Sequence, residues 1–249
     1  MTFELRRRRM GPGRSPAGRD CPLRACTRAG PLYNAPPGAR RRPRRGIPLE
    51  RKVTRIVCGL GNPGAEYEWT PHNLGFHAVE HLARHEGLFF EPAARLEGYS
   101  GPRAFSFARA FEPDALLIKP ETWMNRSGQV VAPIARFCGT APSGVFVVYD
   151  DIDLELGALR IRPGGGTGGH RGMQSIRDEL GTERFPRLRI GVGRPRTDAA
   201  RHVLTRFTPE QRVEAEISVA QAAEATLDWL ESGDLEQCMT RFHSRWNLG

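Results

Sequence analysis

The sequence lacks long hydrophobic runs: nowhere does it approach the 18 successive apolar residues that a membrane-spanning helix needs. The opening residues also lack the apolar segment of a secretory signal. Cysteine is scarce, with five in 249 residues and none in a CxxC pair, so a disulfide framework is not indicated. We therefore expect a protein that is neither secreted nor membrane-bound, working in the reducing environment of the cytoplasm.

Acidic residues are nearly missing from residues 1–52. This segment has 15 of the 37 Lys and Arg and 3 of the 28 Asp and Glu, a charge of 15 − 3 = +12, which leaves 22 − 25 = −3 beyond it. It also has eight prolines and no regular apolar spacing, so we predict a disordered Arg/Pro-rich extension. Three interpretations stay open: an RNA-binding arm, a transit peptide, which the single serine (Ser15) disfavours, or a mis-assigned translation start with the true start near Lys52.

From residue 53 onward, apolar runs bounded by glycine alternate with helical patterns. The runs predict strands at residues 53–60, 115–118, 145–149, 158–161 and 188–192, and the patterns predict helices at about 74–84, 127–137, 172–180 and 209–230. This alternation predicts an α/β fold for residues 53–249: a single three-layer domain with a twisted, mostly parallel (mixed) sheet flanked by helices. In such sheets, functional residues gather at the carboxyl ends of the strands.

A glycine-rich turn, Gly59–Gly64 (GLGNPG), follows the first predicted strand and formally matches the dinucleotide-binding pattern GxGxxG. In that pattern the helix begins within the motif, whereas here Pro71 delays it. The better interpretation is a rigid turn that holds Asn62 and Tyr67 at a strand tip, before a loop that presents His72.

The segment His77–His81 matches HxxEH, a zinc-binding pattern, and His85 extends the same row. The apolar stripe of this predicted helix runs beside the histidines, and no third carboxylate ligand is evident. We therefore expect the histidines to face solvent and predict no metal site here.

Acidic residues crowd the end of the predicted strand 145–149, where Asp150, Asp151 and Asp153 follow the apolar run. They are suited either to binding Mg²⁺ or to orienting a histidine, and spacing alone does not decide between these.

Two other segments also follow predicted strands. Residues 164–172 contain six glycines, which favours exposed backbone N–H groups at a helix start over a flexible linker. Residues 119–128 place Trp123 and Asn125 in a candidate binding wall, with Ser127 as the expected N-cap of the next helix.

Five segments together resemble the bacterial-type peptidyl-tRNA hydrolases, in order and with the expected spacing. They are GLGNPGAEYEWTPHNLGF (59–76), KPETWMNRSG (119–128), DDIDLELG (150–157), GGGTGGHRGMQSI (164–176) and FPRLRIGVGRP (185–195). The resemblance covers about residues 53–245 and leaves out residues 1–52. It implies hydrolysis of the ester between a peptide and the 3′-terminal ribose of tRNA, with peptidyl-tRNA as the partner and with no cofactor or metal.

The resemblance also implies roles for particular side chains. His72 is the general base and Asp150 the carboxylate that orients it. Asn125 holds the attacking water or the substrate. Asn62 lets the enzyme discriminate between peptidyl-tRNA, whose amino group is blocked, and free aminoacyl-tRNA.

Further contacts are expected from two aromatic and two basic residues. Tyr67 and Trp123 would contact the terminal nucleotide or the peptide backbone. Arg162 and Arg189 would hold tRNA phosphate, as a local basic patch on a body that is otherwise slightly acidic.

The chain departs from the family at two positions, where Arg171 replaces an asparagine and Pro71 replaces an arginine. We assign Arg171 to substrate binding and expect it to turn outward to a tRNA phosphate or to pair with a carboxylate. We expect a cytoplasmic monomer without membrane attachment or an obligatory protein partner. The competing hypotheses are a non-catalytic tRNA- or ribosome-binding protein, and a nucleotide-dependent enzyme that uses GLGNPG.

Overall fold

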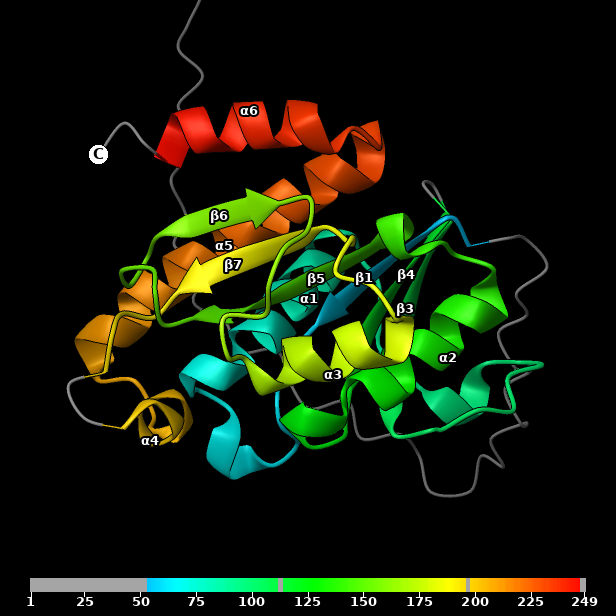
Figure 1. Cartoon of the computed structure of the whole chain (residues 1–249), viewed down its shortest axis with the longest axis horizontal. Coiled ribbons are helices and arrows are strands. Elements are labelled where there is room, and N and C mark those ends of the chain that lie inside the picture. Colours follow the sequence, from blue (N-terminus) through cyan, green and yellow to red (C-terminus); the bar gives the residue numbers. More distant parts are fainter. Residues whose placement is uncertain (1–52, 112–113, 196–197, 247–249) are drawn as a thin grey trace, which may run out of the picture. The chain divides into compact units, whose positions relative to one another are not determined.

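A mixed sheet of seven strands, in the order β2-β3-β4-β1-β5-β7-β6, forms the middle layer of the computed structural model (Figure 1). The structure describes residues 53–111, 114–195 and 198–246. The strands are β1 (Arg55–Gly59), β2 (Glu91–Pro92), β3 (Phe105–Phe111), β4 (Asp114–Pro120), β5 (Val145–Asp151), β6 (Leu159–Arg162) and β7 (Arg187–Gly191). β1 pairs in parallel with β4 and β5, and β5 with β7. The outer pairs β2–β3, β3–β4 and β6–β7 are antiparallel, so the predicted mixed sheet is confirmed.

Helices cover both faces of this sheet. The helices are α1 (Leu74–His85), α2 (Gly128–Cys138), α3 (Arg171–Leu180), α4 (Ala199–Leu204), α5 (Pro209–Ser232) and α6 (Leu235–Trp246). Side chains of β5 alternate between two cores: Phe146 and Val148 pack with residues of α1, α5 and α6, whereas Val147 and Tyr149 pack with residues of α2 and α3. Because β1, β4 and β5 are buried on both sides, their sequences are nearly continuously apolar, as the prediction assumed, whereas β6 alternates buried and exposed residues. No helix in the described part of the chain has the length and apolarity required to cross a membrane.

All the predicted strands and helices are present, with end residues shifted by a few positions. The sequence analysis missed β2, β3, α4 and α6. In β3 the apolar run is interrupted by Ser106 and Arg109, which are nevertheless buried in the structure. α4 has only six residues and is too short for a helical period to be recognised.

Two glycines bring the first helix against the sheet. A Cβ on Gly75 would lie 2.3 Å from the Val148 carbonyl oxygen and 2.4 Å from the Leu60 amide nitrogen, so backbone packs directly on backbone. A Cβ on Gly59 would lie 2.2 Å from the carbonyl oxygen of Gly75. This close approach places the turn that precedes α1 over the carboxyl end of β5.

Candidate active site

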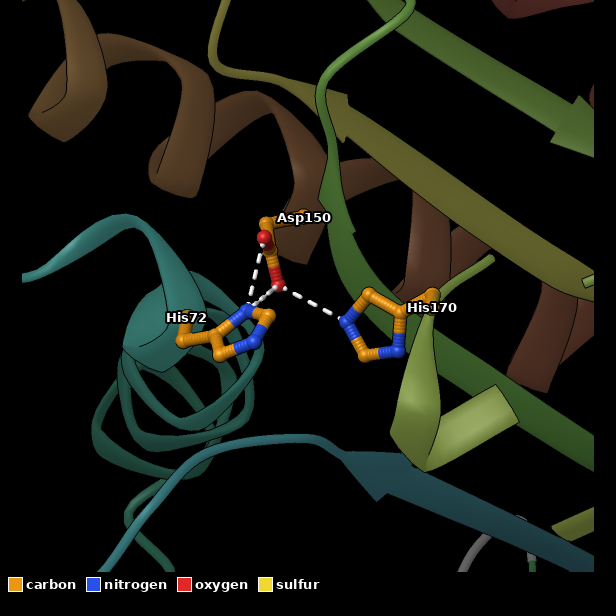
Figure 2. Close-up of side chains that lie close together, drawn as sticks. All are labelled: His72, Asp150 and His170. Carbon is orange, nitrogen blue, oxygen red and sulfur yellow. Dashed lines mark hydrogen bonds and ion pairs between the residues drawn. The ribbon is translucent and has the colours of Figure 1, made fainter. Parts of the chain in front are cut away.

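His72 and Asp150 meet at the carboxyl end of the sheet. His72 lies in the 3₁₀ turn Pro71–Asn73, as the delaying effect of Pro71 predicted, and Asp150 lies near the end of β5 with 1% of its surface exposed. The His72 Nδ1 atom is 2.9 Å from each carboxylate oxygen of Asp150 (Figure 2). An ionised carboxylate only accepts hydrogen bonds, so Nδ1 carries the proton and Nε2 of the neutral ring keeps its lone pair.

A second histidine, His170, contacts the same carboxylate. Its Nε2 atom lies 3.0 Å from Asp150 Oδ1 (Figure 2), and its Nδ1 atom accepts hydrogen bonds from the backbone N–H groups of Gly172 and Met173 at the start of α3. The sequence analysis gave His170 no role, because the segment was interpreted through its glycines. The available signal was its position two residues before the predicted helix 172–180, close to where an N-cap residue lies.

The carboxylate of Asp150 is ionised although it is buried. Burial opposes its charge, but the positive charge that the His72 or His170 ring takes up on protonation, together with the hydrogen bonds that both rings donate, holds its pKa well below the usual range. Among the alternatives for the acidic cluster, the structure therefore favours a carboxylate that orients histidine.

The three side chains have metal-ligating atoms within 4.8 Å of one another, which makes a metal site worth testing. Metal binding through Nε2 of His170 would require that Nδ1 carry the proton, yet two backbone N–H groups point at Nδ1. The hydrogen-bond pattern therefore fits two histidines that both donate to Asp150 better than it fits a metal centre.

The HxxEH segment does not form a metal cluster within the ranges that the structure describes. The expectation that its histidines face solvent is wrong for His77, whose side chain is 12% exposed, stacks 4.0 Å from the Trp69 ring and bonds the Glu68 carbonyl. It is correct for His85, whose side chain is 67% exposed. His77 instead ties α1 to the loop that leads to His72.

A cavity of about 590 Å³ opens beside His72 and Asp150. It brings together most of the predicted site residues: its lining includes Asn62, His72, Trp123, Asn125, Asp150 and Arg171. Tyr67 packs edge-on against Trp123 with ring centroids 6.1 Å apart. Trp123 is 53% exposed, which leaves ring surface available to a ligand.

Asn62, in the lining of this cavity, is held in one orientation. Its Oδ1 atom accepts a 2.9 Å hydrogen bond from the Met124 amide, so the NH₂ group is the end left for a ligand. Its backbone N–H donates to Asn73 Oδ1 (2.8 Å), and its carbonyl accepts from Asn73 Nδ2 (3.0 Å). Asn73 is a positioning residue that the sequence analysis missed, since nothing in the local pattern distinguishes it from a loop asparagine.

Ser127 does not cap α2, contrary to prediction. It occupies the N-cap position with helical backbone angles, and its hydroxyl donates to the Met124 carbonyl at 2.9 Å. That bond closes the short turn Met124–Arg126, which includes Asn125. Ser127 therefore shapes the cavity wall instead of starting the helix.

The predicted basic residues Arg162 and Arg189 lie on the β6–β7 pair, whereas Arg171 lies at the cavity. Arg162 is exposed at the end of β6, and Arg189 on β7 forms an ion pair with Asp151, with Nε 2.5 Å from Oδ2. Arg160, which the sequence analysis did not select, is exposed directly across the strand pair from Arg189. Arg171 is exposed at the cavity, and within the described residues no ion pair joins it to a carboxylate. The carboxylate-paired alternative for Arg171 is therefore not supported.

Comparison with known proteins agrees with this architecture. The family model described as peptidyl-tRNA hydrolase matches residues 56–248. A peptidyl-tRNA hydrolase of Mycobacterium tuberculosis is 43% identical over 191 residues, covering 76% of this chain and 97% of that protein. One from a Synechococcus strain is 41% identical over 198 residues, covering 79% and 85%. The crystal structure of peptidyl-tRNA hydrolase from Acinetobacter baumannii superimposes with a TM-score of 0.68 at 32% identity, covering 77% of this chain and 95% of that one. By fold, by sequence and by the order of its site segments, the chain belongs to the peptidyl-tRNA hydrolase family.

Proposed function

We propose that this chain hydrolyses the ester bond of peptidyl-tRNA, with His72 as general base and Asp150 as its orienting carboxylate. The observation that carries the proposal is the His72–Asp150 hydrogen bond, which leaves Nε2 of His72 unprotonated beside a cavity lined by Asn62 and Asn125. Nε2 takes a proton from water as its oxygen attacks the ester carbonyl, and Asp150 stabilises the imidazolium that forms. The imidazolium then returns the proton to the departing 3′-oxygen, which releases tRNA and the carboxylic acid of the peptide, and this acid loses its proton to solvent.

Amide groups around the cavity supply the remaining contacts of the proposal. The Asn125 side chain lies where it could hold water or the ester oxygen, and hydrogen-bond donors near the developing oxyanion lower the barrier. The NH₂ of Asn62 is suited to a peptide carbonyl. An unblocked substrate would bring an α-ammonium group instead, and two donors facing each other are mismatched.

The tRNA body needs a basic surface outside the cavity. Arg160, Arg162 and Arg189 share one side of the β6–β7 pair, since Arg160 lies opposite Arg189 in the register and alternate residues of a strand point the same way. We assign these side chains to phosphate contacts, with Arg189 oriented through Asp151. Trp123 and Tyr67 would stack on the terminal nucleotide or the peptide backbone.

We propose that the enzyme acts in the cytoplasm, because its substrate arises where translation occurs, and that it acts as a monomer. Cys58, Cys138 and Cys238 are free and buried, as expected for a reducing compartment. Sedimentation of the purified chain tests the monomer, and a second copy required for activity would contradict it.

The deciding experiment measures release of tRNA from N-acetyl-aminoacyl-tRNA by the wild type, His72→Ala and His85→Ala. His72→Ala should lower kcat by about 10²–10⁴ with little change in KM, because a general base contributes that much to the rate. His85→Ala is the matched control, since that imidazole is exposed and remote from Asp150. Near wild-type kcat in His72→Ala would refute the assignment of the base. Binding without turnover by the wild type would favour the alternative of a non-catalytic tRNA-binding protein.

A further inference from the structure

We infer that His170 is a positioning residue for this hydrolysis: as a neutral imidazole fixed by the start of α3, it donates a hydrogen bond to Asp150 and sets how firmly Asp150 holds the proton of His72. The inference rests on the proposed roles of His72 and Asp150. It adds a third side chain, to which the sequence analysis gave no role.

Hydrogen bonds at the start of α3 determine which nitrogen of His170 carries the proton. Its Nδ1 accepts from the amides of Gly172 (3.2 Å) and Met173 (3.3 Å), so Nδ1 carries no proton and Nε2 does. Protonating Nδ1 would break both bonds and would add positive charge at the positive end of the helix dipole. The N-terminus of α3 therefore favours the neutral ring in one tautomer, with Nε2–H aimed at Asp150 Oδ1.

The His170 ring is held in place by its surroundings. The His170 side chain is 8% exposed and packs 5.0 Å from the Tyr149 ring in a T-shaped contact. The glycine-rich loop before it is anchored by the buried Arg187, which donates to the Gly165 and Glu183 carbonyls at 2.8 Å each. Loop, ring and helix thus present Nε2–H in a fixed direction.

The hydrogen bond from His170 acts on one oxygen of the Asp150 carboxylate. Oδ1 is shared between His170 and His72, whereas among the residues that the structure describes Oδ2 accepts only from His72. A donor on Oδ1 withdraws electron density from the carboxylate, so Asp150 binds the His72 proton less tightly than an isolated carboxylate would. The other charged side chains that line the cavity are Asp151, Arg171 and Asp198, and all three stay in place in the variants below.

The test separates the helix-capping role of His170 from its contact with Asp150. His170→Asn and His170→Ser keep a side-chain oxygen for the amides of α3, because both residues are good N-caps, but lack a ring that reaches Asp150. We expect both to fold with near wild-type Tm and KM and to lose about tenfold in kcat. We also expect the acid limb of the pH–rate profile to move to higher pH, by roughly half a unit. His170→Ala removes cap and contact together and should also lower Tm.

A double-mutant cycle completes the experiment. If His170 acts through Asp150, His170→Asn should lower kcat much less in an Asp150→Asn background than in the wild type. Wild-type kcat and pH profile in both His170→Asn and His170→Ser, or equal losses in the two backgrounds, would overturn the inference. An active His72→Ala enzyme would instead refute the proposed function itself, so the two failures are distinguishable.

Discussion

At the scale of single residues, the Asn62 amide has two ends with different partners, which makes substrate discrimination testable. Asn62→Asp keeps an oxygen for the Met124 amide but replaces the NH₂ donor with a negatively charged acceptor. We expect kcat/KM for N-acetyl-aminoacyl-tRNA to fall by about 10–100-fold and the preference over unblocked aminoacyl-tRNA to shrink. Parallel assays of the two substrates measure this preference. An unchanged ratio would show that discrimination lies elsewhere.

Glu80 predicts a pH dependence of stability. Burial opposes its charge, but the imidazole of His77, whose Nδ1 lies 3.7 Å from Glu80 Oε2, and the hydrogen bond and charge of Lys119 lower its pKa from 4.5 to about 2. Because the pKa is lower in the folded state, the stabilisation is full above about pH 4.5 and is lost as pH falls toward 2. The side chain is 35% exposed, so solvent screening limits the effect to about 1 kcal/mol or less.

Glu80→Gln should therefore lower Tm by a few degrees at pH 7, with a gap to wild type that narrows below pH 4.5. Thermal unfolding followed across this pH range measures the gap. Glu97→Gln, at an exposed position, serves as the control. A gap that stays constant down to pH 2 would contradict the ionic origin of the stabilisation.

At the scale of elements, the contact between α1 and the sheet makes a strong prediction. Gly75→Ala would place a Cβ 2.3 Å from the Val148 carbonyl oxygen, so helix and strand must separate. We expect destabilisation of about 1–3 kcal/mol or more, despite the better helix propensity of alanine. We also expect kcat to fall under conditions in which the variant is still fully folded, because the turn with His72 moves with α1. Chemical denaturation and kinetics measure the two effects.

Gly166→Ala is the matched control for this prediction, since a Cβ there would meet no atom within 4 Å. Equal stability losses in the two variants would argue against backbone contact as the cause.

The elements also show what the sequence could and could not predict. Strands such as β5 were predictable because burial on both faces makes the run uniformly apolar, and the position of Asp150 at the strand end followed from it. Its pairing with His72, 78 residues away, is a long-range contact that local patterns do not encode, and it was expected only from the family resemblance. His170 was missed because histidine is not among the preferred N-cap residues.

At the scale of the whole molecule, charge is divided between two parts of the chain, +12 in residues 1–52 and −3 beyond them. We expect deletion of residues 1–51 to leave kcat unchanged, because the proposed site lies entirely within residues 62–204. Binding of tRNA should stay salt-dependent through Arg160, Arg162 and Arg189. Kinetics of the truncated chain at several salt concentrations test this. Loss of the salt dependence on truncation would place the phosphate contacts in residues 1–51.

The cluster of His72, Asp150 and His170 has a consequence for how activity appears during folding. Its members are separated by 78 and then 20 residues and belong to three different segments, so no fragment with local order alone can assemble it. Closing such long loops is slow compared with helix formation. On dilution from denaturant, hydrolysis should therefore return later than the helical circular dichroism signal, which makes turnover a sensitive report of when the last long-range contacts have formed.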